Sequence, residues 1–151
     1  GGLNVSLIQT TQDLNADKVN SETEYSASFT FDSSQLTGAS EVLVNTDVTY
    51  FKAFDNDHSL QATVAYNYFS DQLNTIGTLK KGNVIDKSFN TLDLIVKSKL
   101  NKLNISLSAK NLLNPSIKRV QEVYETPGIS EVTLSEFKRG INISLSVGYR
   151  F

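Results

Sequence analysis

The last eleven residues of the chain alternate apolar and polar side chains without interruption. Because successive side chains of a strand point to opposite sides of the sheet, this pattern predicts a strand with one apolar and one polar face. The apolar face carries Ile141, Ile143, Leu145, Val147, Tyr149 and Phe151, and the polar face carries Asn142, Ser144, Ser146, Gly148 and Arg150. Such a strand separates an apolar medium from a polar one, so the fold must contain that boundary.

The outer-membrane β-barrels of Gram-negative bacteria end in a strand of this kind, with an aromatic residue last. The ending resembles their C-terminal assembly signal, and the residues that carry the resemblance are Ile143, Leu145, Val147, Tyr149 and Phe151. In such barrels the last strand closes the wall, and its apolar face meets lipid. The resemblance implies a location in the cell outer membrane and a final strand that the barrel-assembly machinery recognises.

Composition excludes several other classes of protein. The 151 residues include no Cys, so neither a disulfide framework nor a metal-thiolate site is possible. The net charge is −2 and the basic residues are dispersed, which argues against nucleic-acid binding. No run approaches the roughly 18 apolar residues of a transmembrane helix. The mean hydropathy of −0.22 is still compatible with a barrel, because only alternate residues of a barrel strand face lipid.

Strand periodicity recurs along the chain, whereas helical periodicity does not. Seven strands are predicted, at residues 3–10, 22–32, 41–54, 59–71, 87–100, 102–110 and about 136–151. The predicted fold class is therefore all-β, an antiparallel transmembrane β-barrel segment of about seven up-and-down strands. The whole chain, residues 1–151, is expected to form one portion of a barrel wall, and none of it is typical of a separate domain.

The expected connections alternate in length, as they do in outer-membrane barrels. Counted from the C-terminus, they are 115–135 (long), 101–102 (tight), 72–86 (long) and 55–58 (tight). Further upstream, 33–40 is a moderate loop and 13–20 is longer than a minimal turn. Both are rich in the Asp, Asn, Ser and Gly residues that favour turns.

Periodicity alone does not say which face is wet, since a soluble β-barrel or sandwich has the same alternation turned inside out. Small residues such as Ser26, Ser106 and Ser144 dominate the polar face, which suits a crowded hydrated lumen better than a solvated surface rich in Lys and Glu. Aromatic residues near strand ends would suit interface girdles. They are Tyr50, Phe54, Tyr66, Tyr68, Phe89, Tyr149 and Phe151.

A second resemblance rests on the penultimate strand and the segment after it. The strand ends in the motif Asn111, Leu112, Leu113, Asn114 and Pro115, and Gly140 later opens the final strand. This segment is similar to the C-terminal end of TonB-dependent outer-membrane receptors of Bacteroidetes bacteria, over residues 91–151. The motif also has a purely structural interpretation, because Asn tolerates turn geometry and Pro115 lacks a backbone donor, so that the motif simply ends ladder pairing.

The resemblance implies a receptor or transporter that imports a bulky nutrient such as a siderophore, a glycan or a peptide. In that family a 22-stranded barrel encloses an N-terminal plug, on which the TonB protein pulls. This chain would be the last third of the wall, without the plug. Its partners would be outer-membrane lipid, the rest of the barrel, the plug and, through the plug, TonB. Seven strands alone would leave two unpaired edges, which are costly in lipid.

Three alternatives remain open at this point. The chain could be a complete, structural or adhesive barrel of about eight strands, with residues 75–85 as the extra strand, or it could be a soluble β-sandwich that binds a ligand. An enzyme is disfavoured, because the single histidine, His58, lies in a polar turn and no nucleophile elbow is present. Asp55 and Asp57 lack the remaining ligands of a calcium loop. No catalytic residue, metal or cofactor is expected.

Overall fold

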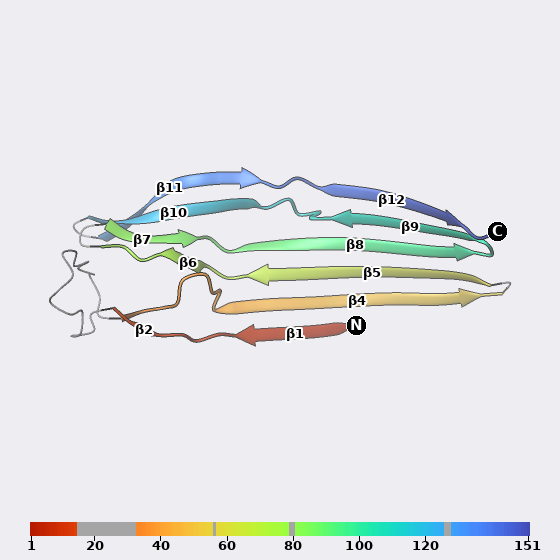
Figure 1. Ribbon diagram of the computed structural model, residues 1–151, viewed down its shortest axis with the longest axis horizontal. Helices are drawn as coiled ribbons and strands as arrows, with labels where there is room; N and C mark the ends of the chain where they lie inside the picture. Colours follow the sequence, from red (N-terminus) through yellow and green to blue (C-terminus); the bar gives the residue numbers. More distant parts are fainter. Residues whose placement is uncertain (15–32, 56, 79–80, 126–127) are drawn as a thin grey trace.

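The structure, a computed structural model, describes residues 1–14, 33–55, 57–78, 81–125 and 128–151. These residues form antiparallel strands and no helix, which confirms the all-β class. The described strands form three sheets. The first, referred to as the larger sheet, has six strands in the order β1-β4-β5-β8-β9-β12 (Figure 1). Their bounds are β1 Gly2–Leu7, β4 Val42–Phe54, β5 His58–Phe69, β8 Phe89–Leu100, β9 Leu103–Lys110 and β12 Asn142–Tyr149.

Within the described residues this sheet is open. Strands β1 and β12 each pair on one side only, so a closed barrel is not seen. The tight connections predicted at 55–58 and 101–102 are confirmed, and both contain a residue with left-handed backbone, Asp57 at φ 61° and Asn101 at φ 57°. Six of the seven predicted strands correspond to strands of this sheet. The predicted strand 22–32 lies outside the described residues.

The register of the strands places most of their apolar residues on one face of the sheet. Directly paired residues of an antiparallel sheet point to the same side. One row across the sheet joins Val48, Val64, Leu94, Ala109 and Ile143, and the next row joins Thr49, Thr63, Ile95, Ser108 and Ser144. The alternation found in the sequence is therefore a property of the whole sheet. The large apolar exceptions on the polar face are Leu43, Phe51, Phe69, Phe89 and Ile95.

The apolar face is not covered by any other part of the described chain. Ile143 is 68% exposed and Leu145 is 67% exposed, and most other apolar side chains of β1 and β12 are also exposed. Among the described hydrophobic residues only Leu73, Ala109 and Val120 are buried. Within the described part of the chain, the sheet thus presents an apolar face with no hydrophobic core behind it.

A second sheet of four strands, in the order β11-β10-β7-β6, continues the first. Its strands are β6 Gln72–Thr75, β7 Lys81–Asp86, β10 Ser116–Glu125 and β11 Gly128–Lys138. Along the chain β6 follows β5, β7 precedes β8, β10 follows β9 and β11 precedes β12, so the lateral order is the same in both sheets. Figure 1 shows the second sheet extending the first at the end away from the C-terminus.

This second sheet corrects the sequence analysis. Residues 72–86 and 115–135, expected as long loops, form the hairpins β6–β7 and β10–β11. The segment 75–85, considered above as the extra strand of a small barrel, pairs within the second sheet rather than the first. The last strand begins at Asn142 and not near Glu136, because Gly140, at φ 83°, interrupts it. A minor ladder joins β2 (Gln12–Asp13) to β3 (Ser33–Ser34).

Candidate functional site

The two sheets meet along a line of irregular backbone that crosses four strands. The chain leaves regular pairing at 70–71, 87–88, 111–115 and 139–141, between β5 and β6, β7 and β8, β9 and β10, and β11 and β12. We refer to this line as the junction. The Asn111–Pro115 motif lies on it, so the motif marks the place where the penultimate strand changes from one sheet to the other.

The motif forms a turn that only a few residue types adopt easily. Asn111 and Asn114 both have left-handed backbone, at φ 58° and 43°, a region in which Asn is several-fold enriched. The Asn114 amide donates a hydrogen bond to the Asn111 carbonyl at 2.9 Å. Pro115 then directly precedes β10. Of the two leucines, Leu112 donates its amide to the Leu92 carbonyl at 2.8 Å, and Leu113 is exposed.

The asparagine side chains of the motif bind the backbone of the neighbouring strand. Asn111 Nδ2 donates to the Gly140 carbonyl at 2.7 Å, and the Gly140 amide donates to Asn114 Oδ1 at 3.0 Å. These two hydrogen bonds take the place of the ladder between β9 and β12, which ends at the pair Lys110 and Asn142. The geometry agrees with the structural interpretation, in which the motif ends ladder pairing. The backbone groups of Gly140 are hydrogen-bonded by the two asparagine side chains instead of by the ladder.

We expect Asn111→Gly to lower the free energy of unfolding by about 1 kcal/mol, because it removes the hydrogen bond to Gly140 while the left-handed backbone stays accessible. Asn101→Gly is the matched control, since Asn101 has nearly the same φ and no side-chain hydrogen bond to another described residue. Denaturant unfolding of both variants measures the difference. An equal loss of unfolding free energy at the two positions would contradict a stabilising role for the hydrogen bond from Asn111 to Gly140.

The residues that resemble the assembly signal lie elsewhere. Ile143, Leu145, Val147 and Tyr149 share the apolar face of β12, and Phe151 follows the strand, with its ring edge-on to that of Tyr149 at 5.2 Å. They lie along the edge strand and its end, and none of them lines a hollow at the junction. The structure therefore separates the two sets of residues that the sequence analysis singled out.

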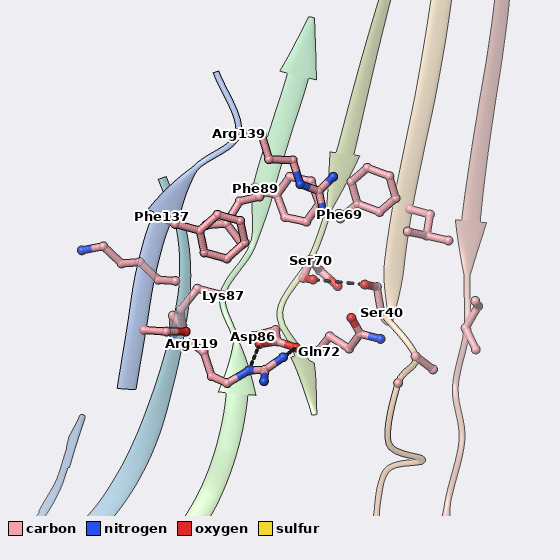
Figure 2. Close-up of a pocket in the computed structure, with 17 residues that line it drawn as sticks. Ser40, Phe69, Ser70, Gln72, Asp86, Lys87, Phe89, Arg119, Phe137 and Arg139 are labelled. Carbon is pink, nitrogen blue, oxygen red and sulfur yellow. Dashed lines mark hydrogen bonds and ion pairs between the residues drawn. The ribbon is translucent and has the colours of Figure 1, made fainter. Parts of the chain in front are cut away.

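A cavity of about 700 Å³ lies at the junction, on the side to which the polar face of the larger sheet points. Phe69 and Phe89 are directly paired there, and their rings stack at 4.9 Å with 17° between their planes. Phe137, from β11, completes an aromatic group (Figure 2). Phe89 thus faces the polar side, which corrects its expected place in an aromatic girdle on the apolar face.

Polar and charged groups also line this cavity, next to further apolar residues such as Leu43 and Ile117. Arg119 donates two hydrogen bonds to the Asp86 carboxylate, from Nε at 2.6 Å and from a terminal nitrogen at 3.0 Å. This pair joins β10 to β7, and the hydrogen bonds from Arg119 hold the pKa of the Asp86 carboxyl below its ordinary value despite partial burial. Gln72, the strand partner of Asp86, lies next to this pair, and the hydrogen-bonded hydroxyl of Ser40 also lines the cavity (Figure 2).

The lysines at the cavity are also paired. Lys87 Nζ lies 2.9 Å from a carboxylate oxygen of Asp71 and 3.1 Å from one of Glu131. Lys118 Nζ lies 3.4 Å from a carboxylate oxygen of Glu136. Partial burial raises the pKa of Asp71, but hydrogen bonds from Lys87 and Ser88 outweigh that effect and leave this pKa below its ordinary value. Arg139 differs, because it forms no ion pair or hydrogen bond with another described residue through its side chain.

These ion pairs make the second sheet sensitive to acid. Because the pKa values of Asp71 and Asp86 are lower in the folded chain than in the unfolded one, their stabilisation is present above the ordinary carboxyl pKa and is lost as pH falls through the lowered values. We expect amide protection factors in β7 and β10 to fall over that range, as hydrogen exchange would measure. Asp86→Asn should lower protection at pH 6 and flatten the pH dependence.

Glu125→Gln is the control for this experiment. It removes a carboxylate from β10, the strand that pairs with β7, and the Glu125 side chain has no hydrogen bond or ion pair to another described residue. It should therefore keep the full pH dependence of the parent protein. A parent protein whose protection in β7 and β10 did not change between pH 6 and pH 3 would contradict the role of the two pairs.

Two smaller hollows lie on the same polar face. One, of about 300 Å³, shares Phe89, Ile117 and Arg139 with the cavity and adds Asp93 and Lys110. The other, of about 260 Å³, lies towards the opposite end of the sheet, around Lys97. The first hollow extends the junction cavity across β9 and β12, so that the Phe89 and Arg139 side chains stand between two adjoining spaces.

Other candidates from the sequence do not gather into a site. His58 begins β5 at the end away from the junction and pairs with Phe54 and Leu100. The described residues contain no group of three His, Asp or Glu side chains that could hold a metal ion. Nor do they include a helix of the length and apolarity that crossing a membrane requires.

Comparison with known proteins gives no further guide. Neither a family model, nor a curated protein, nor a solved structure matches this chain.

Proposed function

We propose that this chain is part of the wall of an outer-membrane β-barrel and that it works in nutrient uptake as the last third of a TonB-dependent receptor. The single observation that carries the proposal is the uncovered apolar face of the six-stranded sheet. Water-soluble monomers rarely expose a continuous apolar patch of that extent. A lipid bilayer would cover this face without any further layer of protein.

The opposite face supports the same proposal. It carries small polar residues, with Thr49 and Thr63 hydrogen-bonded across β4 and β5 at 3.0 Å. A sheet with an apolar face and an opposite face of small polar residues suits a wall between lipid and a hydrated lumen. In a soluble β-sandwich a second sheet would cover the apolar face, and the second sheet described here continues the first instead of stacking on it.

The two open edges favour a larger wall over a free-standing one. In hydrocarbon each unpaired backbone group costs several kcal/mol, so β1 and β12 would need neighbouring strands from the rest of the barrel. The strands that run on beyond the junction fit walls that project out of the membrane. The Asn111–Pro115 motif and the final strand resemble those of TonB-dependent receptors. On that resemblance, the proposed partners are a nutrient, the plug and TonB.

Site-directed spin labelling of the protein in lipid vesicles tests the membrane proposal. The chain has no native cysteine, so Leu145→Cys and Ser144→Cys give single labels on opposite faces of β12. The label at position 145 should collide more often with oxygen, which concentrates in lipid, than with a water-soluble nickel chelate. The label at position 144 should not show this preference. A label at position 145 shielded from both reagents would point to a soluble protein core and overturn the proposal.

A further inference from the structure

The junction cavity combines an aromatic wall with a cation, Arg139, that has no carboxylate partner among the described residues. Of the four Lys and Arg residues that line it, Lys87, Lys118 and Arg119 each contact a carboxylate within the described residues, and Arg139 does not. Figure 2 shows Arg139 extending from the segment before β12 towards the rings of Phe89 and Phe69. The guanidinium is therefore available to an anion that enters the cavity.

We propose that this cavity binds a small organic carboxylate with an aromatic or apolar body, with Arg139 holding the carboxylate. The planar guanidinium matches a carboxylate with two parallel hydrogen bonds. The stacked pair of Phe69 and Phe89, with Phe137 beside it, offers apolar surface to the body of the ligand. The volume of about 700 Å³ falls within the usual range for small-molecule sites.

Three further features favour this ligand over a bare inorganic anion or a neutral hydrocarbon. The lining is mainly apolar, so a small hydrated anion would leave most of the surface uncovered. Arg119 donates two hydrogen bonds to Asp86, so among the described lining residues Arg139 is left as the cation without a carboxylate partner. Gln72 lines the cavity with a side-chain amide that has no hydrogen bond to another described residue, so a purely hydrocarbon ligand would leave this amide unmatched.

This inference rests on the proposed function, since a lumenal cavity of this chemistry would contact the nutrient on its way through the barrel. It narrows the nutrient to compounds that carry a carboxylate beside an aromatic or apolar group. The plug is a second possible occupant of the same face. A cavity filled by the plug would not admit a small molecule, so a binding experiment with a small probe also separates these two occupants.

The test is binding of 2-naphthoate to the purified full-length receptor, followed by the fluorescence anisotropy of the probe. The neutral analogue 2-naphthylmethanol reports partition into detergent or apolar surface. We expect 2-naphthoate to bind more tightly than the alcohol, and Arg139→Gln to weaken its binding about tenfold or more. Phe89→Ala should weaken the binding of both probes, because it removes the apolar wall.

Arg150→Gln is the matched control, because it removes an arginine at the far end of β12 that lines none of the described hollows. It should leave the affinity for 2-naphthoate unchanged. Equal affinity for the acid and the alcohol, or an unchanged affinity in Arg139→Gln, would overturn the inference. The spin-label experiment is independent of the cavity, so failure of the binding site and failure of the membrane proposal are distinguishable.

Discussion

Removal of residues 141–151 should abolish assembly of the protein into membranes. The deletion strips β12 from β9, along which eight residue pairs are in register from Asn142 and Lys110 to Tyr149 and Leu103. In the proposed barrel the freed edge of β9 would lie in hydrocarbon, where each unsatisfied backbone group costs several kcal/mol. Even a few such groups exceed the roughly 5–15 kcal/mol that typically stabilise a folded protein, so no folded fraction should remain.

The measurement is the folded, heat-modifiable band on cold SDS gels after insertion into vesicles. A matched change shortens the second sheet by replacing residues 122–131 with Asn-Gly, which joins the paired residues Gln121 and Val132 through a two-residue turn. That variant keeps β12 and should still assemble, because the shortened hairpin lies beyond the junction. Normal assembly without residues 141–151 would contradict the role of β12 in the wall.

Leu145→Arg should lower the stability of the membrane-inserted protein by about 2–4 kcal/mol, the cost of an arginine on the lipid face near the bilayer midplane. Leu145 lies midway along β12 and points to the apolar face, 67% exposed. Ser144→Arg is the control. Position 144 is adjacent to Leu145 and faces the polar side, so an arginine there should lower the stability much less. Reversible urea unfolding from vesicles measures both values.

The contrast between these two adjacent residues is what tests the assignment of faces. If Ser144→Arg proved the more costly substitution, the polar face would be the one in contact with lipid, and the proposed orientation of the wall would be wrong. The comparison cancels the effect of the added charge, because both variants introduce an arginine into the same strand, β12, at adjacent positions that pair with β9.

The larger sheet was predictable from the sequence because one physical rule governs it. A period of two over a whole strand fixes which side chains share a face, and register follows, since a slip by one residue would reverse every side chain. Val48, Val64 and Leu94 were each assigned to the apolar side by alternation alone, and pairing aligns all three in one row. The tight turns were predictable for a similar reason, from local residue types.

The second sheet was not predictable in this way. Its strands mix charged and apolar residues on both faces, as in the run Lys118, Arg119 and Val120, so that alternation disappears. Part of what holds them together is pairing between distant residues. Arg119 and Asp86 lie 33 residues apart, and nothing in either local sequence indicates the other.

The junction cavity was missed because its residues break the pattern that predicted the rest. Phe89 has the residue type of the apolar face and the orientation of the polar one. Phe69 follows Tyr68, so the sequence places an aromatic on each face and does not say which is unusual. A large aromatic out of phase with its strand, opposite another aromatic, is the signal that could have located the cavity.

From β4 to β9 every strand of the larger sheet pairs with the strands that come before and after it within that sheet. Each hairpin of this order could be added or removed without breaking the pairs on either side of it. In the proposed barrel, duplication of one hairpin would change the circumference of the wall. The same modular order would thus, over evolutionary time, yield wider or narrower barrels from one repeating unit.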